Sequence, residues 1–92
     1  MRITDIRILP FDTGDQYGRI RAFVEIELEG ELRIAGIKIM ESAAGGLFLT
    51  WPSVRSHSGG YRLVVIPAKE LAREMRDQVI QAYHAAQKSN RT

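Results

Sequence analysis

Apolar and polar residues alternate along much of the chain, which is the pattern of β-strands with one buried face. Residues 1–9 show it first, with Ile6 and Ile8 on one face, and this strand is predicted to end at Pro10. The alternation is clearest over residues 19–28. There the predicted core face carries Ile20, Ala22, Val24, Ile26 and Leu28, and the solvent face carries Arg19, Arg21, Phe23, Glu25 and Glu27.

Residues 29–31 (Glu-Gly-Glu) predict a tight turn into a further strand. Matching the apolar faces across this turn pairs Ile26 with Ile34. The same register sets Glu27 opposite Arg33 on the solvent face. An opposite-charge pair across two strands supports this register by a few tenths of a kcal/mol.

The strand that follows changes parity near Gly36. Up to Ile34 the apolar residues occupy one set of alternating positions, but beyond Gly36 they occupy the other set, at Ile37 and Ile39. One extra residue next to a glycine is typical of a β-bulge, which restores the inward face. We therefore predict a bulge at residues 35–36.

The middle of the chain predicts two more strands joined by a polar loop. Residues 41–46 read as a flexible turn, and residues 47–51 alternate again. Pro52 directly after the strand removes a backbone donor, so the ladder is predicted to end there. Residues 52–60 then form a presented loop, and residues 61–66 form the last strand.

The C-terminal segment, residues 68–88, has apolar residues at helical spacing and predicts one amphipathic helix. Its apolar stripe is Leu71, Ala72, Met75, Val79, Ala82, Tyr83 and Ala86. The predicted fold class is α+β: an antiparallel sheet of about five strands with this helix on one face. Residues 1–88 form a single domain, residues 11–18 form a loop, and residues 89–92 are expected to fray.

A domain of 92 residues buries only part of its surface, which favours association with a second copy. We expect a homodimer in which a strand edge, from residues 19–28 or residues 61–66, pairs with its twin. The chain contains no cysteine, no signal peptide and no apolar run long enough to span a membrane. These absences favour a cytoplasmic protein without disulfides.

Candidate chemistry concentrates in the loop. Its hydroxyls, imidazole and guanidinium each donate a hydrogen bond without a pocket, which suits contact with phosphate, although solvated hairpin loops have a similar composition. The net charge of +2 is too small to indicate nucleic acid by itself. The candidate nucleic-acid-binding residues are Ser53, Arg55, Ser56, His57 and Arg62 around the loop, Arg19 and Arg21 in the second strand, and Lys69 and Arg73 in the helix.

Catalysis and metal binding find little support in the sequence. His57 and His84 are the only histidines, and neither has a predicted partner that would activate a nucleophile. Asp12 and Asp15 lack the calcium-loop pattern, and the glycines at residues 45–46 lack the lysine and helix of a phosphate-binding loop. The sequence therefore predicts no enzyme, no metal and no cofactor.

Four short segments, in order, resemble the SpoVG family of small bacterial regulators. Residues 46–62 (GLFLTWPSVRSHSGGYR) are similar to the family core "GLF…PS-[KR]-[KR]…G-x-[FY]-R". Residues 3–7 (ITDIR) resemble "VTDVR", residues 18–22 (GRIRA) resemble "G-[RK]-[ML]-[RK]-A", and residues 79–83 (VIQAY) resemble "AVLxxY". Where the family core has two basic residues, this chain has Val54 and Arg55.

This resemblance implies a dimeric DNA- and RNA-binding regulator, connected with septation and sporulation, that has no catalytic activity. The alternative is a protein–protein interaction module that uses a strand edge or the apolar flank formed by Trp51 and Val54. Clustering of the candidate arginines in space would favour the first function. Their scattering over opposite faces would favour the second.

Overall fold

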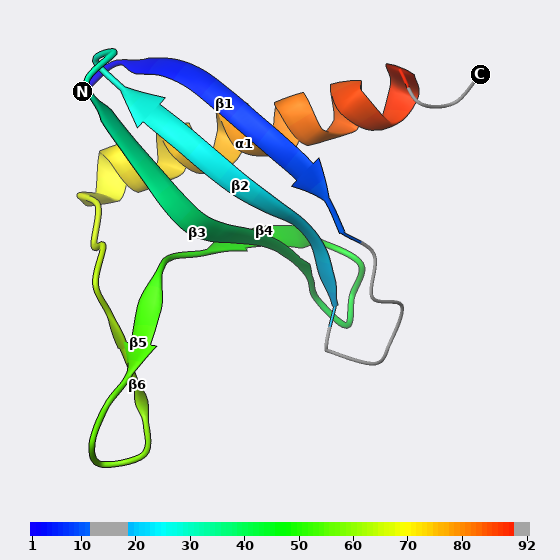
Figure 1. Cartoon of the computed structure of the whole chain (residues 1–92). Helices are drawn as coiled ribbons and strands as arrows, with labels where there is room; N and C mark the ends of the chain where they lie inside the picture. The colour runs from blue at the N-terminus through cyan, green and yellow to red at the C-terminus, as the bar shows by residue number, and fades with distance from the viewer. Residues whose placement is uncertain (12–18, 90–92) are drawn as a thin grey trace.

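The computed structural model describes residues 1–11 and 19–89 of the chain. The elements, in chain order, are β1 (Ile3–Pro10), β2 (Ile20–Leu28), β3 (Leu32–Glu41), β4 (Leu47–Thr50), β5 (Ser53–Arg55), β6 (Tyr61–Leu63) and α1 (Lys69–Ser89). The first four strands form one antiparallel sheet in the order β1-β2-β3-β4, and β5 and β6 form a separate two-stranded sheet (Figure 1). The predicted α+β class is confirmed.

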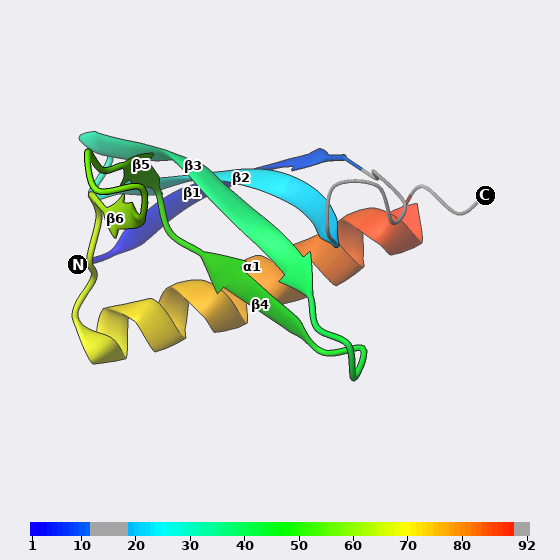
Figure 2. The ribbon, with the colours of Figure 1, turned by 90° about the horizontal axis from the view of Figure 1, so that it is seen from below.

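The molecule has two layers, because α1 packs across one face of the four-stranded sheet (Figure 2). The buried core between the layers consists of Ala22, Val24, Ile26, Leu28, Ile37, Ile39, Met75, Val79 and Tyr83. Four of the five predicted inward positions of β2 therefore meet the helix stripe, through Met75, Val79 and Tyr83. The prediction for Ile20 is wrong, since it pairs with Met40 beyond a register shift and is not part of the core. The other face of the sheet is covered by no described element.

The predicted turn, register and bulge between β2 and β3 are confirmed. Ile26 pairs with Ile34 and Glu27 with Arg33, as the matching of faces required. The next pair is Val24 with Ile37, so β3 contributes one extra residue at this point. Gly36 has a φ of 86°, a left-handed value that side-chain-bearing residues rarely adopt, which explains the glycine at the bulge.

A second irregularity, which the alternation does not reveal, lies at the start of β2. Ala22 pairs with Ile39 but Ile20 pairs with Met40, so here the extra residue, Arg21, is in β2. Arg21 lines a hollow together with Tyr83 of α1. The prediction that Arg21 lies on the solvent face is therefore wrong, because the irregularity turns its side chain toward the helix.

The prediction for residues 52–66 is wrong in part. The ladder does end before Pro52, but Ser53–Arg55 form a strand and not a loop. They pair with Tyr61–Leu63, and the last strand stops there, so residues 64–66 lie outside it. The pair forms a two-stranded ribbon of its own, which projects from the body (Figure 1).

The proposed pairing of residues 19–28 with a second copy is also wrong, since β2 lies between β1 and β3 and both of its edges are occupied. The free edges of the large sheet belong to β1 and β4. Helix α1 includes Ser89, one residue into the predicted tail. Residues 90–92 and the predicted loop at 12–18 lie outside the described residues. No helix in the described part of the chain is long and apolar enough to cross a bilayer.

Candidate nucleic-acid interface

The ribbon of β5 and β6, with the turn at residues 56–60, is called the arm below. It leaves the body directly after Trp51, whose half-buried side chain packs against the core. At its base the backbone amide of Val64 donates to the Pro52 carbonyl at 2.9 Å. A Cβ on Gly36 would lie 3.6 Å from Pro52, so the base of the arm rests against the bulge of β3. The proline and the bulge together set the direction in which the arm projects.

The turn at the tip of the arm is built by Ser56. Its backbone amide donates to the carbonyl of Gly60 at 2.7 Å, and its hydroxyl lies 3.0 Å from the same oxygen. The hydroxyl also lies 3.0 Å from that of Ser58. Gly59 closes the turn with a φ of 95°. The hydroxyl of Ser56 therefore shapes the turn, whereas His57 is exposed at the tip.

The two arginines of the arm point to opposite faces of the ribbon. Arg55 pairs with Tyr61, and Arg62 pairs with Val54 in the next row. Successive residues of a strand face opposite ways, so Arg55 shares its face with Tyr61 and Ser53, while Arg62 shares the other face with Val54. Both arginines are exposed, and neither makes an ion pair with a described residue.

The helix candidates lie at the same end of the molecule as the arm. Lys69 and Arg73 occupy the first turns of α1, to which the chain returns directly from the arm (Figure 1). Both side chains are exposed. Among the predicted site residues, those of the arm and those of the helix start therefore belong to one end of the molecule.

Arg19 and Arg21 lie elsewhere, at the end of the sheet where β2 begins, opposite the arm (Figure 1). Arg21 forms an ion pair of 2.8 Å with Glu41, and Arg19 donates to the carbonyl of Ser42 at 3.0 Å. These bonds fasten the start of β2 to the end of β3. The structure does not bring these two arginines together with the arm.

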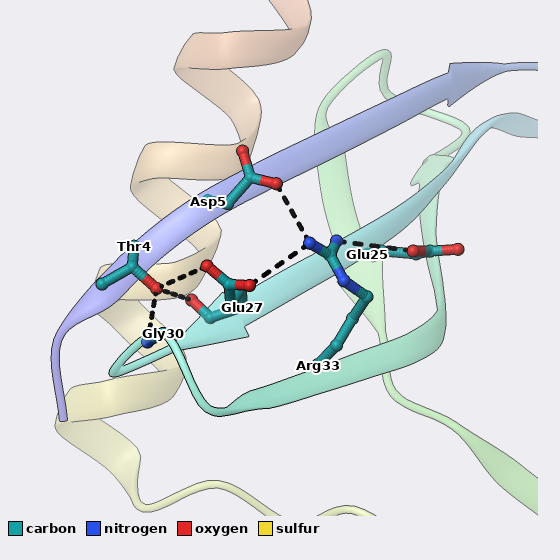
Figure 3. Close-up of polar contacts among 6 residues, drawn as sticks. All are labelled: Thr4, Asp5, Glu25, Glu27, Gly30 and Arg33. Carbon is teal, nitrogen blue, oxygen red and sulfur yellow. Dashed lines mark hydrogen bonds and ion pairs between the residues drawn. The ribbon is translucent and has the colours of Figure 1, made fainter.

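The opposite corner of the sheet carries a cluster of charges around Arg33 (Figure 3). Its guanidinium lies 3.2 Å from Asp5, 3.4 Å from Glu27 and 3.5 Å from Glu25. The hydrogen bond to Asp5 contributes most to raising the pKa of Arg33, partial desolvation opposes it, and the charges of the three carboxylates add to the rise. The sequence register predicted only the contact with Glu27. Three carboxylates around one guanidinium leave an excess of negative charge, which repels a polyanion.

A hollow of about 730 Å³ opens between the far end of the sheet and the second half of α1. Aromatic side chains of Phe11, Tyr83 and His84 line it, and the ion pair of Arg21 with Glu41 is on its wall. Within the described residues, no three His, Asp or Glu side chains gather closely enough to hold a metal ion. The sequence did not indicate this hollow.

The sequence profile of the SpoVG family matches residues 1–85. This chain belongs to the SpoVG family. The resemblance carried by the four short segments is thus confirmed. A SpoVG protein of Priestia megaterium is 33% identical over 85 residues, which cover 91% of this chain and 84% of that protein. The SpoVG protein of Bacillus subtilis is 32% identical over the same length, with the same coverage.

A further SpoVG protein, of Symbiobacterium thermophilum, is 32% identical over 90 residues. The match covers 97% of this chain but 61% of that relative, so this chain spans about three fifths of its length. The names of all three relatives refer to septation. The matches extend through the arm, so the ribbon falls within the region that the SpoVG family shares.

Proposed function

We propose that this SpoVG-family protein is a dimeric, non-catalytic regulator in the cytoplasm that binds the backbone of DNA or RNA through the arm. The observation that carries this proposal is that all charged residues of the arm are positive. Between Ser42 and Lys69 the sequence has no Asp or Glu, but it contains Arg55, Arg62 and Lys69. The names of the relatives suggest that the regulated process is septation.

The contrast with the body supports the assignment to the arm. Arg33 is surrounded by carboxylates and Arg21 is paired with Glu41, so their charges are largely compensated. Arg55 and Arg62 form no ion pair with a carboxylate in the described structure. Phosphates bind where positive charge is uncompensated, and such contacts carry little sequence information. The proposed binding is therefore weakly selective.

The apolar side chains of the arm support a dimer. Within the arm Tyr61 is 78% exposed and Leu63 is 46% exposed, and directly after it Val64 and Ile66 are exposed as well. An isolated two-stranded hairpin is marginally stable in water, so a second copy that covers these side chains would stabilise the arm. Dimerisation would also present two basic arms on one assembly, which raises avidity without any new contact.

The protein–protein interaction module stays a second candidate, because one observation favours it. Arg55 and Arg62 point to opposite faces of the ribbon, so one flat row of phosphates cannot meet both. Val54 is exposed on the arm and could belong to a protein contact, whereas Trp51 is half-buried against the core.

Fluorescence anisotropy with labelled duplex DNA and RNA across a salt series tests the proposed function. Neutralised phosphates release counterions, so affinity should fall steeply with salt, and we expect a Kd on the order of micromolar at physiological salt. Arg55→Ala should lower the log–log slope by about one per arm. Arg76→Ala is the matched control, because Arg76 is an exposed helix arginine beside Asp77 and outside the proposed site. It should leave the slope unchanged.

Failure to bind either nucleic acid at low salt would exclude the proposed function. An unchanged slope and affinity for Arg55→Ala would exclude the arm as the phosphate site. In both cases the interaction module is preferred. Sedimentation equilibrium at micromolar concentration tests the dimer separately, and a monomer throughout that range would contradict it.

A further inference from the structure

All three phenylalanines of the chain lie outside the core. Phe23 and Phe48 are on the face of the sheet that α1 does not cover, and Phe11 lies where that face meets the hollow beside α1. Phe23 lies between buried Ala22 and Val24, so its side chain points away from the helix. Phe48 is 42% exposed and lies between two leucines that pack against the core. The ring of Phe11 is 5.0 Å from that of Phe23. Burial of aromatic rings stabilises a fold strongly, so their exclusion from the core requires another explanation.

The strand register places these rings in one patch, called the phenylalanine patch below. One row across the sheet reads Leu9, Phe23, Lys38 and Thr50, and the neighbouring row contains Met40 and Phe48. Leu9 and Phe11 are exposed at the β1 side of this patch. Phe23 and Phe48 are on strands two apart, which corresponds to roughly 10 Å. The patch thus presents separate aromatic rings on one face of the four-stranded sheet.

Lys38 gives the patch its charge. Its side chain makes no hydrogen bond or ion pair with any described residue. The nearest acid on this face is Glu25, in the row next to Phe23, and its carboxylate lies 3.5 Å from the guanidinium of Arg33. The two rows of the patch contain no acid. A ligand that covers the patch and carries an anion would therefore compensate the charge of Lys38.

We propose that the phenylalanine patch binds single-stranded nucleic acid, with bases stacked on the phenylalanine rings and a phosphate at Lys38. This inference rests on the proposed function and adds a second surface to it. Bases in a duplex stack on one another, whereas an extended single strand offers free base faces that can reach rings on separate strands. Stacking tolerates any base, in keeping with weak sequence selectivity.

A second copy of the chain fits the patch less well. If two patches packed face to face about a two-fold axis, each Lys38 would be desolvated against rows that contain no carboxylate, since Glu25 of the next row is already in contact with Arg33. Burying an unpaired ammonium group is costly. A nucleic-acid strand brings the phosphate that Lys38 lacks, and this charge complementarity favours it as the occupant.

Substitutions of Phe48 test the stacking. Binding of oligothymidylate and oligouridylate of about 12 nucleotides is compared with binding of duplex DNA by anisotropy. Phe48→Ala should weaken single-strand binding about tenfold and leave duplex binding and the salt slope unchanged. Phe48→Leu keeps an apolar side chain but loses the ring, so it should weaken binding similarly. Phe48→Trp should retain affinity, and its fluorescence should be quenched by the bound strand.

The phosphate contact is tested by Lys38→Gln, which should lower the single-strand salt slope by about 0.7. Leu32→Ala is the control for an exposed apolar side chain, because Leu32 is at the other end of the sheet and is 50% exposed. It should leave single-strand binding unchanged. An unchanged circular dichroism spectrum and urea midpoint establish that each variant is folded.

The outcomes separate this inference from the proposed function. If the parent protein binds and Arg55→Ala weakens binding, but both Phe48→Ala and Phe48→Leu bind single strands normally, the patch is not a stacking surface and the arm remains the site. If Phe48→Ala dissociates the dimer in sedimentation, the patch is a protein interface and the inference is wrong. If the parent protein binds no nucleic acid, both proposals fall.

Discussion

The four-stranded sheet and the arm are built from similar residues but have opposite surroundings. In β2, Val24 and Ile26 are fully buried beneath α1. In β6, Tyr61 and Leu63 follow the same kind of alternation, yet they remain exposed. The difference lies in the helix, which covers one part of the sheet and does not extend over the arm (Figures 1 and 2). An alternating pattern thus predicts a strand, but it does not predict which layer covers that strand.

The largest expected difference between the two regions is in stability. Ile37→Ala removes a fully buried side chain from the body and should lower the free energy of unfolding by about 2–5 kcal/mol. Leu63→Ala removes an apolar side chain that is 46% exposed on the arm, and it should cost less than about 1 kcal/mol in the monomer. Urea denaturation below the concentration of dimer formation measures both.

At concentrations where the dimer forms, Leu63→Ala should also raise the dissociation constant seen in sedimentation equilibrium, because the arm would lose part of its contact surface. Equal losses of monomer stability for the two variants would show that the arm belongs to the cooperative body. The comparison between the two regions would then be wrong.

A smaller effect is expected at Gly36, where the body meets the base of the arm. Gly36→Ala should cost about 1–3 kcal/mol, because its φ of 86° is strained for any side chain. Crowding adds little, since the new Cβ would lie 3.6 Å from Pro52, an ordinary contact. Gly46→Ala is the control, because Gly46 has no positive φ and its Cβ would meet only the Ser42 hydroxyl, also at 3.6 Å. Matching urea midpoints for the two variants would contradict the strained bulge.

The smallest effect is expected at the Arg33 cluster, where, in contrast to the arm, the arginine is surrounded by carboxylates. Arg33→Gln should lower the urea midpoint slightly, and less at about 0.5 M salt, because exposed ion pairs are screened. The folded-state pKa of Arg33 is raised, so its stabilising effect is complete below the ordinary arginine pKa and is lost only above it. The midpoint difference should therefore stay constant from about pH 6 to about pH 9. A difference that changes across this range would indicate another titrating group.

Much of the body could be predicted from the sequence, because the alternating apolar positions of its strands are the positions that the helix buries. The faces of β2, the pairing of Glu27 with Arg33 and the bulge at Gly36 all follow from matching apolar positions. The displacement of Arg21 could not be predicted in this way, because the irregularity that causes it leaves the apolar alternation of β2 unbroken. Arg21 forms an ion pair with Glu41, and this partner can be identified only once the pairing of β2 with β3 is known.

The candidate site was predicted less completely. The stretch of the arm was located by its composition, and its second strand was predicted at residues 61–66. Its first strand was not predicted, because the short run Ser53–Arg55 is polar enough to read as a loop. Whether Arg55 and Arg62 share a face depends on the register of β5 with β6, and the sequence does not fix that register. The phenylalanine patch was missed because its rings come from three separate strands or strand ends, and only the sheet order brings them together.

The narrow base of the arm has a consequence for substitutions within the arm. None of residues 53–63 belongs to the described core or packs against it, and the arm is anchored through Pro52 and the amide of Val64. Substitutions in this segment should therefore leave the packing of the sheet against the helix unchanged. The same body could thus carry an arm of different charge and shape without loss of the fold.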